Sequence, residues 1–105
     1  MSVTGAVVVI APVASSSLAQ TDVEKVAAGA RVYGDYCANC HGEELRNTTG
    51  GATFDLRRLR AADRDRFFSV VMNGKSQMPP WRGVLQLQQI DSIWSYIRAT
   101  VDRSQ

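Results

Sequence analysis

The feature that most constrains this chain is the segment Cys37-Ala38-Asn39-Cys40-His41, because it holds both cysteines and the only histidine among 105 residues. A chain of this length forms one domain, and so small a domain usually needs a disulfide, a metal or a cofactor to complete its core. A disulfide between two cysteines so close in sequence would close a very short loop and constrain little. Some other group should therefore complete the core.

The spacing C-x-x-C-H is the attachment signature of a c-type haem. On one helical turn the thiols of Cys37 and Cys40 face the same side, so both can reach one edge of a porphyrin. The imidazole of His41 is then a suitable ligand for the iron. Two other interpretations stay open, although a structural zinc ion usually needs about four ligands. A dithiol oxidoreductase would need a βαβ context, which the sequence lacks.

The apolar spacing predicts helices and no strands, and hence an all-α fold. The predicted helices cover about Asp22–Asp35, about Ala62–Asn73 and about Leu87–Val101. Asp22 is a suitable cap for the first, and Gly74 fits the left-handed residue that closes the second. The apolar positions expected to face inward recur at helical spacing: Val23, Val26, Ala30, Tyr33, Phe67, Val70, Val71, Leu87, Ile90, Ile93, Trp94, Ile97 and Val101.

The first nineteen residues differ from the rest, because they hold no charged and no aromatic side chain. Val7–Ile10 is apolar, and Ser17-Leu18-Ala19 places small residues where a signal peptidase reads them. We predict a secretory signal peptide over residues 1–19 and one haem-binding domain over residues 20–105, in a periplasmic protein. The segment lacks the usual basic start, and a disordered or interfacial tail is the alternative. A membrane span is not expected, since the run is short and broken by Pro12.

A second iron ligand is predicted at Met78, which precedes two prolines in Gln77-Met78-Pro79-Pro80-Trp81. A residue before proline favours extended backbone, and two prolines stiffen the segment, so the thioether can be held against a metal. Met72 competes for this role, although its place in a predicted helix also suits a core-filling methionine. The predicted cofactor-binding residues are Cys37, Cys40, His41 and Met78, with the iron held by His41 and Met78.

From Asp22 to Val101 the sequence resembles the class I cytochromes c. Gly29 and Tyr33 match the G-x-x-x-aromatic pattern of that family's N-terminal helix, and Trp94-Ser95-Tyr96-Ile97 matches its C-terminal helix. The resemblance implies three or four helices wrapped around one covalently bound haem c with its iron. It also implies that the terminal helices cross where Gly29 meets Tyr96.

The chain departs from the family pattern in one respect, because no proline lies between His41 and Met78. The family commonly uses a proline carbonyl there to accept the histidine N–H, and a carbonyl near Asn47–Gly51 is expected to substitute. Three segments also look like the small cytochromes paired with quinoprotein (pyrroloquinoline quinone) alcohol dehydrogenases. These segments are Leu45–Gly51, Phe54–Leu59 and Met78–Trp81. The likeness implies a dehydrogenase as electron donor, and a terminal oxidase or another cytochrome as acceptor.

The net charge of +2 is too small to indicate a nucleic-acid partner. The basic residues nevertheless cluster at Arg57, Arg58, Arg60, Arg64 and Arg66, and Lys75 and Arg82 flank the predicted methionine loop. Such a cluster either steers docking to an acidic redox partner or forms ion pairs on a solvated face. We expect a monomeric electron carrier with no catalytic residues. The alternatives are a haem catalyst or gas sensor with an open sixth position, and a zinc or dithiol module.

Overall fold

The computed structural model describes residues 5–6 and 14–103, with side chains in the first helix from residue 21 onward. Its helices are α1 (Ala14–Tyr36), α2 (Ala38–His41), α3 (Arg64–Asn73) and α4 (Leu87–Arg103). Short 3₁₀ turns occupy Glu43–Leu45 (η1), Leu56–Arg58 (η2) and Ala61–Asp63 (η3). Over the described ranges the chain forms no strand, only two isolated bridges in one loop. The predicted all-α class is confirmed.

The helices begin and end close to their predicted bounds, except that α1 begins at Ala14 rather than near Asp22. Neither glycine nor proline interrupts the sequence between Ala14 and Gly29, so nothing in it stops the helix earlier. Most of the predicted signal segment, residues 1–19, lies outside the described residues, and cleavage after Ala19 stays a prediction. Gly74 closes α3 with a positive φ of 77°, as expected, but its ψ of 165° lies outside the left-handed helical conformation.

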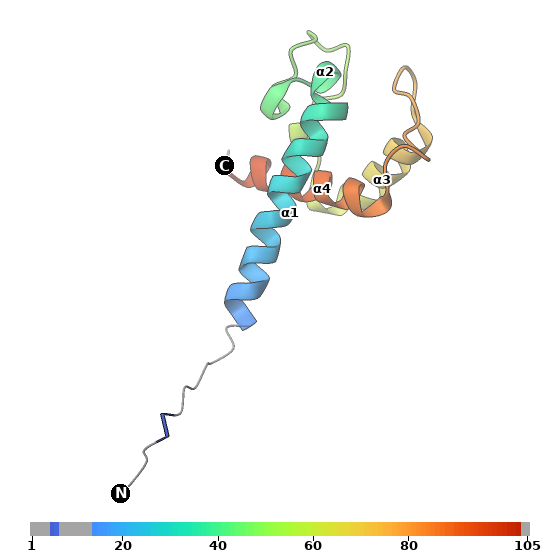
Figure 1. Cartoon of the computed structure of the whole chain (residues 1–105). Coiled ribbons are helices and arrows are strands. Elements are labelled where there is room, and N and C mark those ends of the chain that lie inside the picture. The colour runs from blue at the N-terminus through green and yellow to red at the C-terminus, as the bar shows by residue number, and fades with distance from the viewer. Residues whose placement is uncertain (1–4, 7–13, 104–105) are drawn as a thin grey trace, which may run out of the picture.

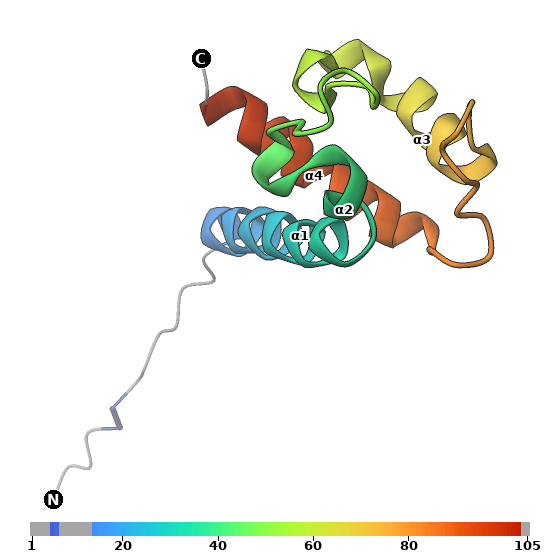
Figure 2. The same cartoon turned by 90° about the horizontal axis from the view of Figure 1, so that it is seen from above.

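The fold is organised by the crossing of α1 over α4, which both views show (Figures 1 and 2). A Cβ added to Gly29 would lie 1.8 Å from the carbonyl oxygen of Ser92. The two backbones are therefore too close at this point for any residue other than glycine at position 29. The predicted crossing of the terminal helices at Gly29 is confirmed, and the atoms nearest to an added Cβ belong to the backbone of Ser92 and Ile93. Tyr96 packs against Tyr33, with ring centroids 5.2 Å apart.

The core lies between α4, the adjoining face of α1 and the turns that follow α2. Apart from Leu87, the predicted stripe of α4 is buried throughout. Leu87 is 60% exposed because it is the first residue of its helix, and Val23 is 69% exposed on the part of α1 that extends beyond the crossing (Figure 1). Phe67 and Val71 of α3 are buried as predicted, whereas Val70 is only half-buried.

Asp91 of α4 ties the three long helices together. Its carboxylate pairs with Lys25 of α1, and it also accepts a hydrogen bond from the Arg64 guanidinium of α3 at 2.9 Å. The Lys25 ammonium and then the Arg64 guanidinium hold the pKa of Asp91 below its usual range. Each such pair at a partly exposed position stabilises the fold by about 0–1 kcal/mol.

Gly29→Ala is expected to reduce the free energy of unfolding by about 2–3 kcal/mol, since the added methyl group meets the backbone of α4. Gly34→Ala, in the same helix, is the matched control because its added Cβ meets nothing within 4 Å. It should leave stability unchanged or raise it by up to about 1 kcal/mol. Guanidinium unfolding followed by circular dichroism measures both, and equal effects at the two glycines would contradict the assigned crossing.

Candidate functional site

The C-x-x-C-H segment lies at the end of α1, beyond the crossing with α4 (Figure 1). Cys37 separates α1 from α2, and its N–H still donates to the Tyr33 carbonyl at 2.8 Å. The N–H groups of Cys40 and His41 both donate to the Cys37 carbonyl, at 3.2 and 2.9 Å. The motif therefore forms one continuous helical turn, and residues at this spacing share a face.

The two thiols are free and differ in their surroundings. Cys37 is half-buried and packs against the core, whereas Cys40 is exposed. Burial, and secondarily the neighbouring Cys40, raise the pKa of the Cys37 thiol to about 12. Reactive redox cysteines instead have lowered pKa values in electropositive surroundings, so this thiol is unsuited to dithiol exchange.

His41 is oriented by a backbone carbonyl. Its Nδ1 lies 3.1 Å from the carbonyl oxygen of Phe54, which can only accept, so the contact requires the ring proton on Nδ1. Nε2 then keeps its lone pair for a metal. Burial lowers the pKa of His41, and the hydrogen bond to Phe54 offsets part of that shift. The lowered pKa favours the neutral ring that a metal needs. The expected acceptor near Asn47–Gly51 is therefore wrong, because the loop places Phe54 there instead.

The chain reverses direction immediately after His41. Gly42 has a φ of 87°, and an added Cβ would lie 2.8 Å from the amide nitrogen of Asn47, so this position favours glycine. The Asn47 N–H donates to the His41 carbonyl at 3.0 Å, and the buried Tyr33 hydroxyl donates to the Gly42 carbonyl at 2.5 Å. Tyr33 thus connects the motif to the core, a role that its match to the aromatic position did not predict.

A second feature is the loop between α3 and α4, here called the Met78 strap (Lys75–Leu85). Lys75 and Met78 exchange two backbone hydrogen bonds, of 3.1 and 2.9 Å. The N–H of Trp81 donates to the Val71 carbonyl at 2.8 Å, which fixes the strap to the last turn of α3. Trp81 also packs edge-on against Tyr36, with ring centroids 5.5 Å apart. This contact brings the strap to the end of α1, next to Cys37.

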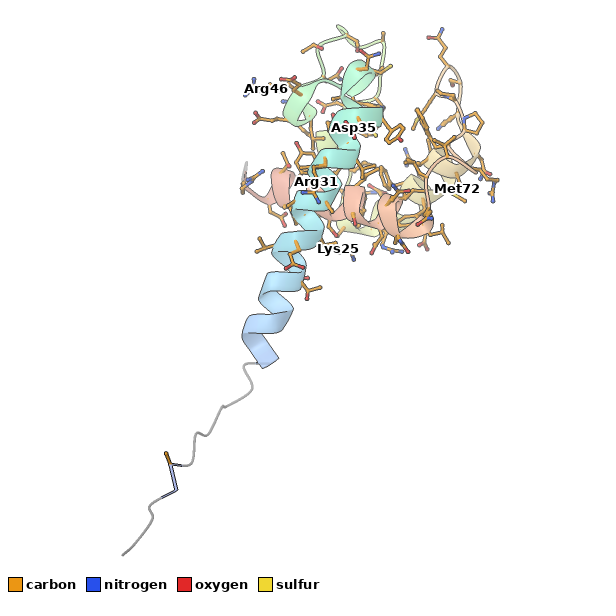
Figure 3. All side chains as sticks on the ribbon, in the orientation of Figure 1. Lys25, Arg31, Asp35, Arg46 and Met72 are labelled. Atoms are coloured by element: carbon orange, nitrogen blue, oxygen red, sulfur yellow. The ribbon has the colours of Figure 1, made fainter. Side chains whose placement is uncertain are left out.

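The two candidate methionines occupy different elements. Met78 lies in the strap, and Met72 lies in α3, where Figure 3 labels it. Both are half-buried and pack against the core. The carbonyl of Met72 accepts a hydrogen bond from the N–H of Arg82 at 3.2 Å, so its backbone is part of the strap's anchorage. The structure brings Cys37, Cys40 and His41 together in one turn, whereas both methionines lie in other segments of the chain.

The residues around the motif fit a large apolar cofactor. Tyr36 and Phe54, which flank the motif and its acceptor loop, are 40% and 46% exposed, and Cys37, Met78 and Trp81 are half-buried beside them. Exposed apolar groups gathered around free thiols and a neutral imidazole suit a haem, which needs an apolar surround, two thiols and an axial nitrogen. When bound, haem supplies an iron that accepts and releases one electron.

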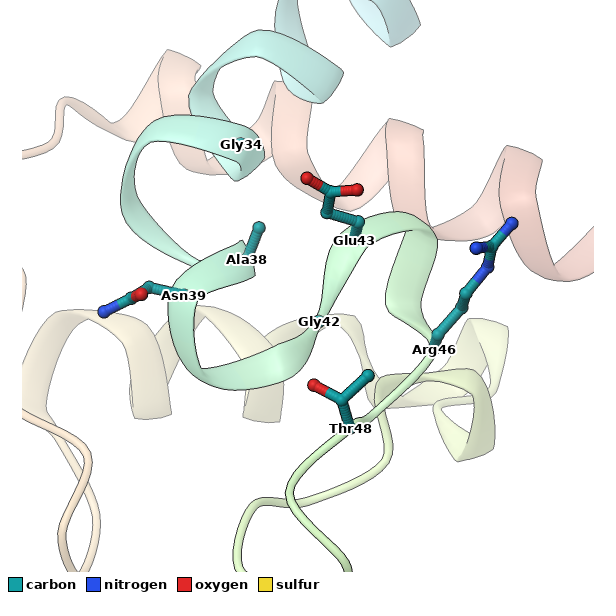
Figure 4. Close-up of a pocket in the computed structure, with 7 residues that line it drawn as sticks. All are labelled: Gly34, Ala38, Asn39, Gly42, Glu43, Arg46 and Thr48. Carbon is teal, nitrogen blue, oxygen red and sulfur yellow. The ribbon is translucent and has the colours of Figure 1, made fainter.

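A cavity of about 490 Å³ lies beside α2 and is lined in part by the two residues between the motif cysteines. It is lined by Gly34, Ala38, Asn39, Gly42, Glu43, Arg46 and Thr48, as Figure 4 shows. None of the predicted cofactor-binding residues contributes to it.

Most of the basic cluster is internally paired. Arg57 donates two hydrogen bonds to Asp55, each of 2.9 Å, and Arg60 and Arg64 pair with Asp63 and Asp91. The ion-pair interpretation of the cluster is therefore confirmed for these three arginines, and a broad docking patch on η2 and η3 is not supported.

Comparison with known proteins identifies the family. Residues 24–97 match the sequence profile described as cytochrome c oxidase, cbb3-type, subunit III. The chain is 31% identical over 78 residues to the quinohemoprotein alcohol dehydrogenase ADH-IIG of Pseudomonas putida, covering 72% of this chain and 11% of that enzyme. No solved structure gives a significant match. Among the described helices, none is both long enough and apolar enough to cross a membrane.

A cytochrome c6 of Leptolyngbya boryana is 34% identical over 74 residues, which cover 68% of this chain and 87% of that cytochrome. Another, from Nostoc sp., is 27% identical over 77 residues, covering 70% and 69% of the two chains. Proteins of this kind typically work outside the cytoplasm with redox partners. The match replaces the zinc and dithiol interpretations. The chain belongs to this cytochrome c family of electron-transfer haem proteins, with an all-α class I fold and covalently bound haem c.

Proposed function

We propose that Cys37 and Cys40 form the two thioether bonds to haem, and that His41 and Met78 are the axial ligands of its iron. The observation that carries this proposal is the contact of His41 Nδ1 with the Phe54 carbonyl, which directs the basicity of the ring to Nε2. A thioether as the other ligand favours reduced iron and so raises the reduction potential. This ligand pair suits an electron carrier with no open coordination position.

Three features of the strap favour Met78 over Met72. Trp81 and Arg82 of the strap donate backbone hydrogen bonds to α3, and a Cβ on Gly74 would lie 2.7 Å from the Met78 carbonyl oxygen, so the backbone around Met78 is closely held. Pro79 restricts Met78 to extended backbone. Trp81 holds the strap against Tyr36 at the end of α1, whereas Met72 belongs to α3.

The cellular role is proposed from the relatives and the N-terminal sequence. The protein is exported to the periplasm, with residues 1–19 as signal peptide and 20–105 as the cytochrome domain, and acts there as a monomer. A quinoprotein dehydrogenase donates the electron, and a terminal oxidase or another cytochrome accepts it. Support comes from two quinohemoprotein alcohol dehydrogenases of Pseudomonas putida, of whose length the chain spans only 11%.

Met78→Ala is expected to lower the reduction potential and to let added imidazole or carbon monoxide bind, because the thioether ligand is lost. Met72→Leu is the matched control and should keep the sulfur–iron charge-transfer band at a packing cost below about 1.5 kcal/mol. Visible spectra and redox titration of both variants decide the assignment. The reverse pattern, in which Met72→Leu abolishes the band, would make Met72 the ligand.

Gly74→Ala tests whether the strap positions the ligand. The added Cβ meets the Met78 carbonyl, so the variant should bind added imidazole more tightly than wild type as the native sulfur–iron bond weakens. Gly83→Ala controls for backbone strain, because Gly83 also has a positive φ, of 84°, but its Cβ would meet nothing within 4 Å. It should cost about 1–2 kcal/mol of stability and leave imidazole binding unchanged. Equal imidazole affinity in the two variants would mean that the strap does not position the iron ligand.

Reduction by a quinoprotein alcohol dehydrogenase tests the proposed donor. Lys75→Glu should slow stopped-flow reduction roughly tenfold at low salt, with the difference shrinking at high salt as the charge is screened. Lys75 is the better probe, because the Arg82 guanidinium already donates to the Asn73 side chain at 2.8 Å. Arg31→Glu, on the α1 surface that Figure 3 labels, makes the same charge change and should have no such effect. Absence of reduction by the dehydrogenase would exclude this donor.

A further inference from the structure

We infer that Asn47, Thr49 and Thr53 form a positioning cluster that holds the Phe54 carbonyl against His41 and so sets the reduction potential. This inference rests on the proposal that His41 is an iron ligand. The three residues touch neither thiol, and they act through the hydrogen bond between His41 Nδ1 and the Phe54 carbonyl.

The cluster is closed by short polar contacts within one loop. The Thr49 and Thr53 hydroxyl oxygens lie 2.7 Å apart, and both lie within 3.2 Å of the Asn47 side-chain oxygen. The Thr53 N–H donates to the Thr49 hydroxyl oxygen at 3.1 Å, and the Asn47 amide donates to the Thr53 carbonyl at 3.3 Å. The three side chains are half-buried, so these bonds are partly shielded from competition by water.

The same cluster is attached to the C-x-x-C-H turn at two carbonyls, those of Cys40 and His41. The Thr53 hydroxyl donates to the Cys40 carbonyl at 3.2 Å, and the Asn47 N–H donates to the His41 carbonyl at 3.0 Å. Thr53 directly precedes Phe54, so any shift of Thr53 moves the acceptor of the His41 proton. Residues 42–55 contain neither proline nor cysteine, so the position of this loop depends on its side-chain hydrogen bonds.

This arrangement acts on the iron through the basicity of its ligand. A hydrogen bond donated by Nδ1–H to a carbonyl makes the imidazole a stronger electron donor at Nε2. Stronger donation favours oxidised iron and lowers the potential. Weakening the cluster should therefore lengthen the bond to Phe54 and move the potential to more positive values.

The test uses the haem-loaded protein and three variants. Thr53→Val keeps the size of the side chain and removes its hydroxyl, Thr53→Ser restores the hydroxyl, and Thr48→Val removes an exposed neighbouring hydroxyl outside the cluster. The measurements are the midpoint potential and, by NMR of the reduced protein, the exchange rate of the His41 Nδ1–H proton with solvent.

Thr53→Val should raise the potential and speed exchange about tenfold, the loss of roughly one hydrogen bond. Thr53→Ser and Thr48→Val should match wild type in both measurements. If Thr53→Val does not retain haem, Thr49→Val takes its place and should shift both values in the same direction. If Thr53→Val, or Thr49→Val in its place, keeps the wild-type potential and exchange rate, the inference is overturned. A shift of the same size in Thr48→Val would also overturn it. The sulfur–iron charge-transfer band reports the Met78 ligand separately. If the wild-type protein lacks this band, the Met78 assignment is wrong, and the exchange rate of the His41 Nδ1–H proton still tests the cluster.

Discussion

The close approach of α1 and α4 at Gly29 is the constraint on which the rest of the structure depends. It lets Tyr33, one turn further along α1, pack against Tyr96 and reach the Gly42 carbonyl with its hydroxyl. Gly42 directly follows His41, so the position of the C-x-x-C-H turn depends on the packing of the two terminal helices. Helix packing thereby becomes the first step in building the site.

The sequence allowed the helices, the buried stripe of α4 and the C-x-x-C-H turn to be predicted, because each rests on periodicity or on a side-chain pattern. The helix ends were less accurate, since the start of α1 at Ala14 depends on the absence of any residue that would stop it. The Phe54 carbonyl could not be predicted, because every residue has a carbonyl and only the path of the loop decides which one faces His41. The resemblance located the helix crossing at Gly29, but not the backbone atoms of Ser92 and Ile93 that lie nearest to it, since family likeness does not give atomic contacts.

The arginine cluster illustrates a second limit of sequence reasoning. Its charge density suggested a docking patch, yet Arg57 and Arg60 pair with acids of their own segment, and Arg64 reaches Asp91 on α4. The acids between these arginines were visible in the sequence, whereas Asp91 lies far along the chain. Charge counted along a sequence therefore overstates the charge that a partner would meet on the folded surface.

The way in which the acceptor for His41 is held also bears on how relatives of this protein can diverge. A carbonyl carried on a loop and fixed by three polar side chains can be moved slightly by one substitution, with the helices left intact. The glycine at the helix crossing allows no such graded change, because any larger residue meets backbone. On the proposal that His41 binds the iron, the reduction potential is thus open to stepwise change over evolution within one scaffold, while the packing of the helices is not.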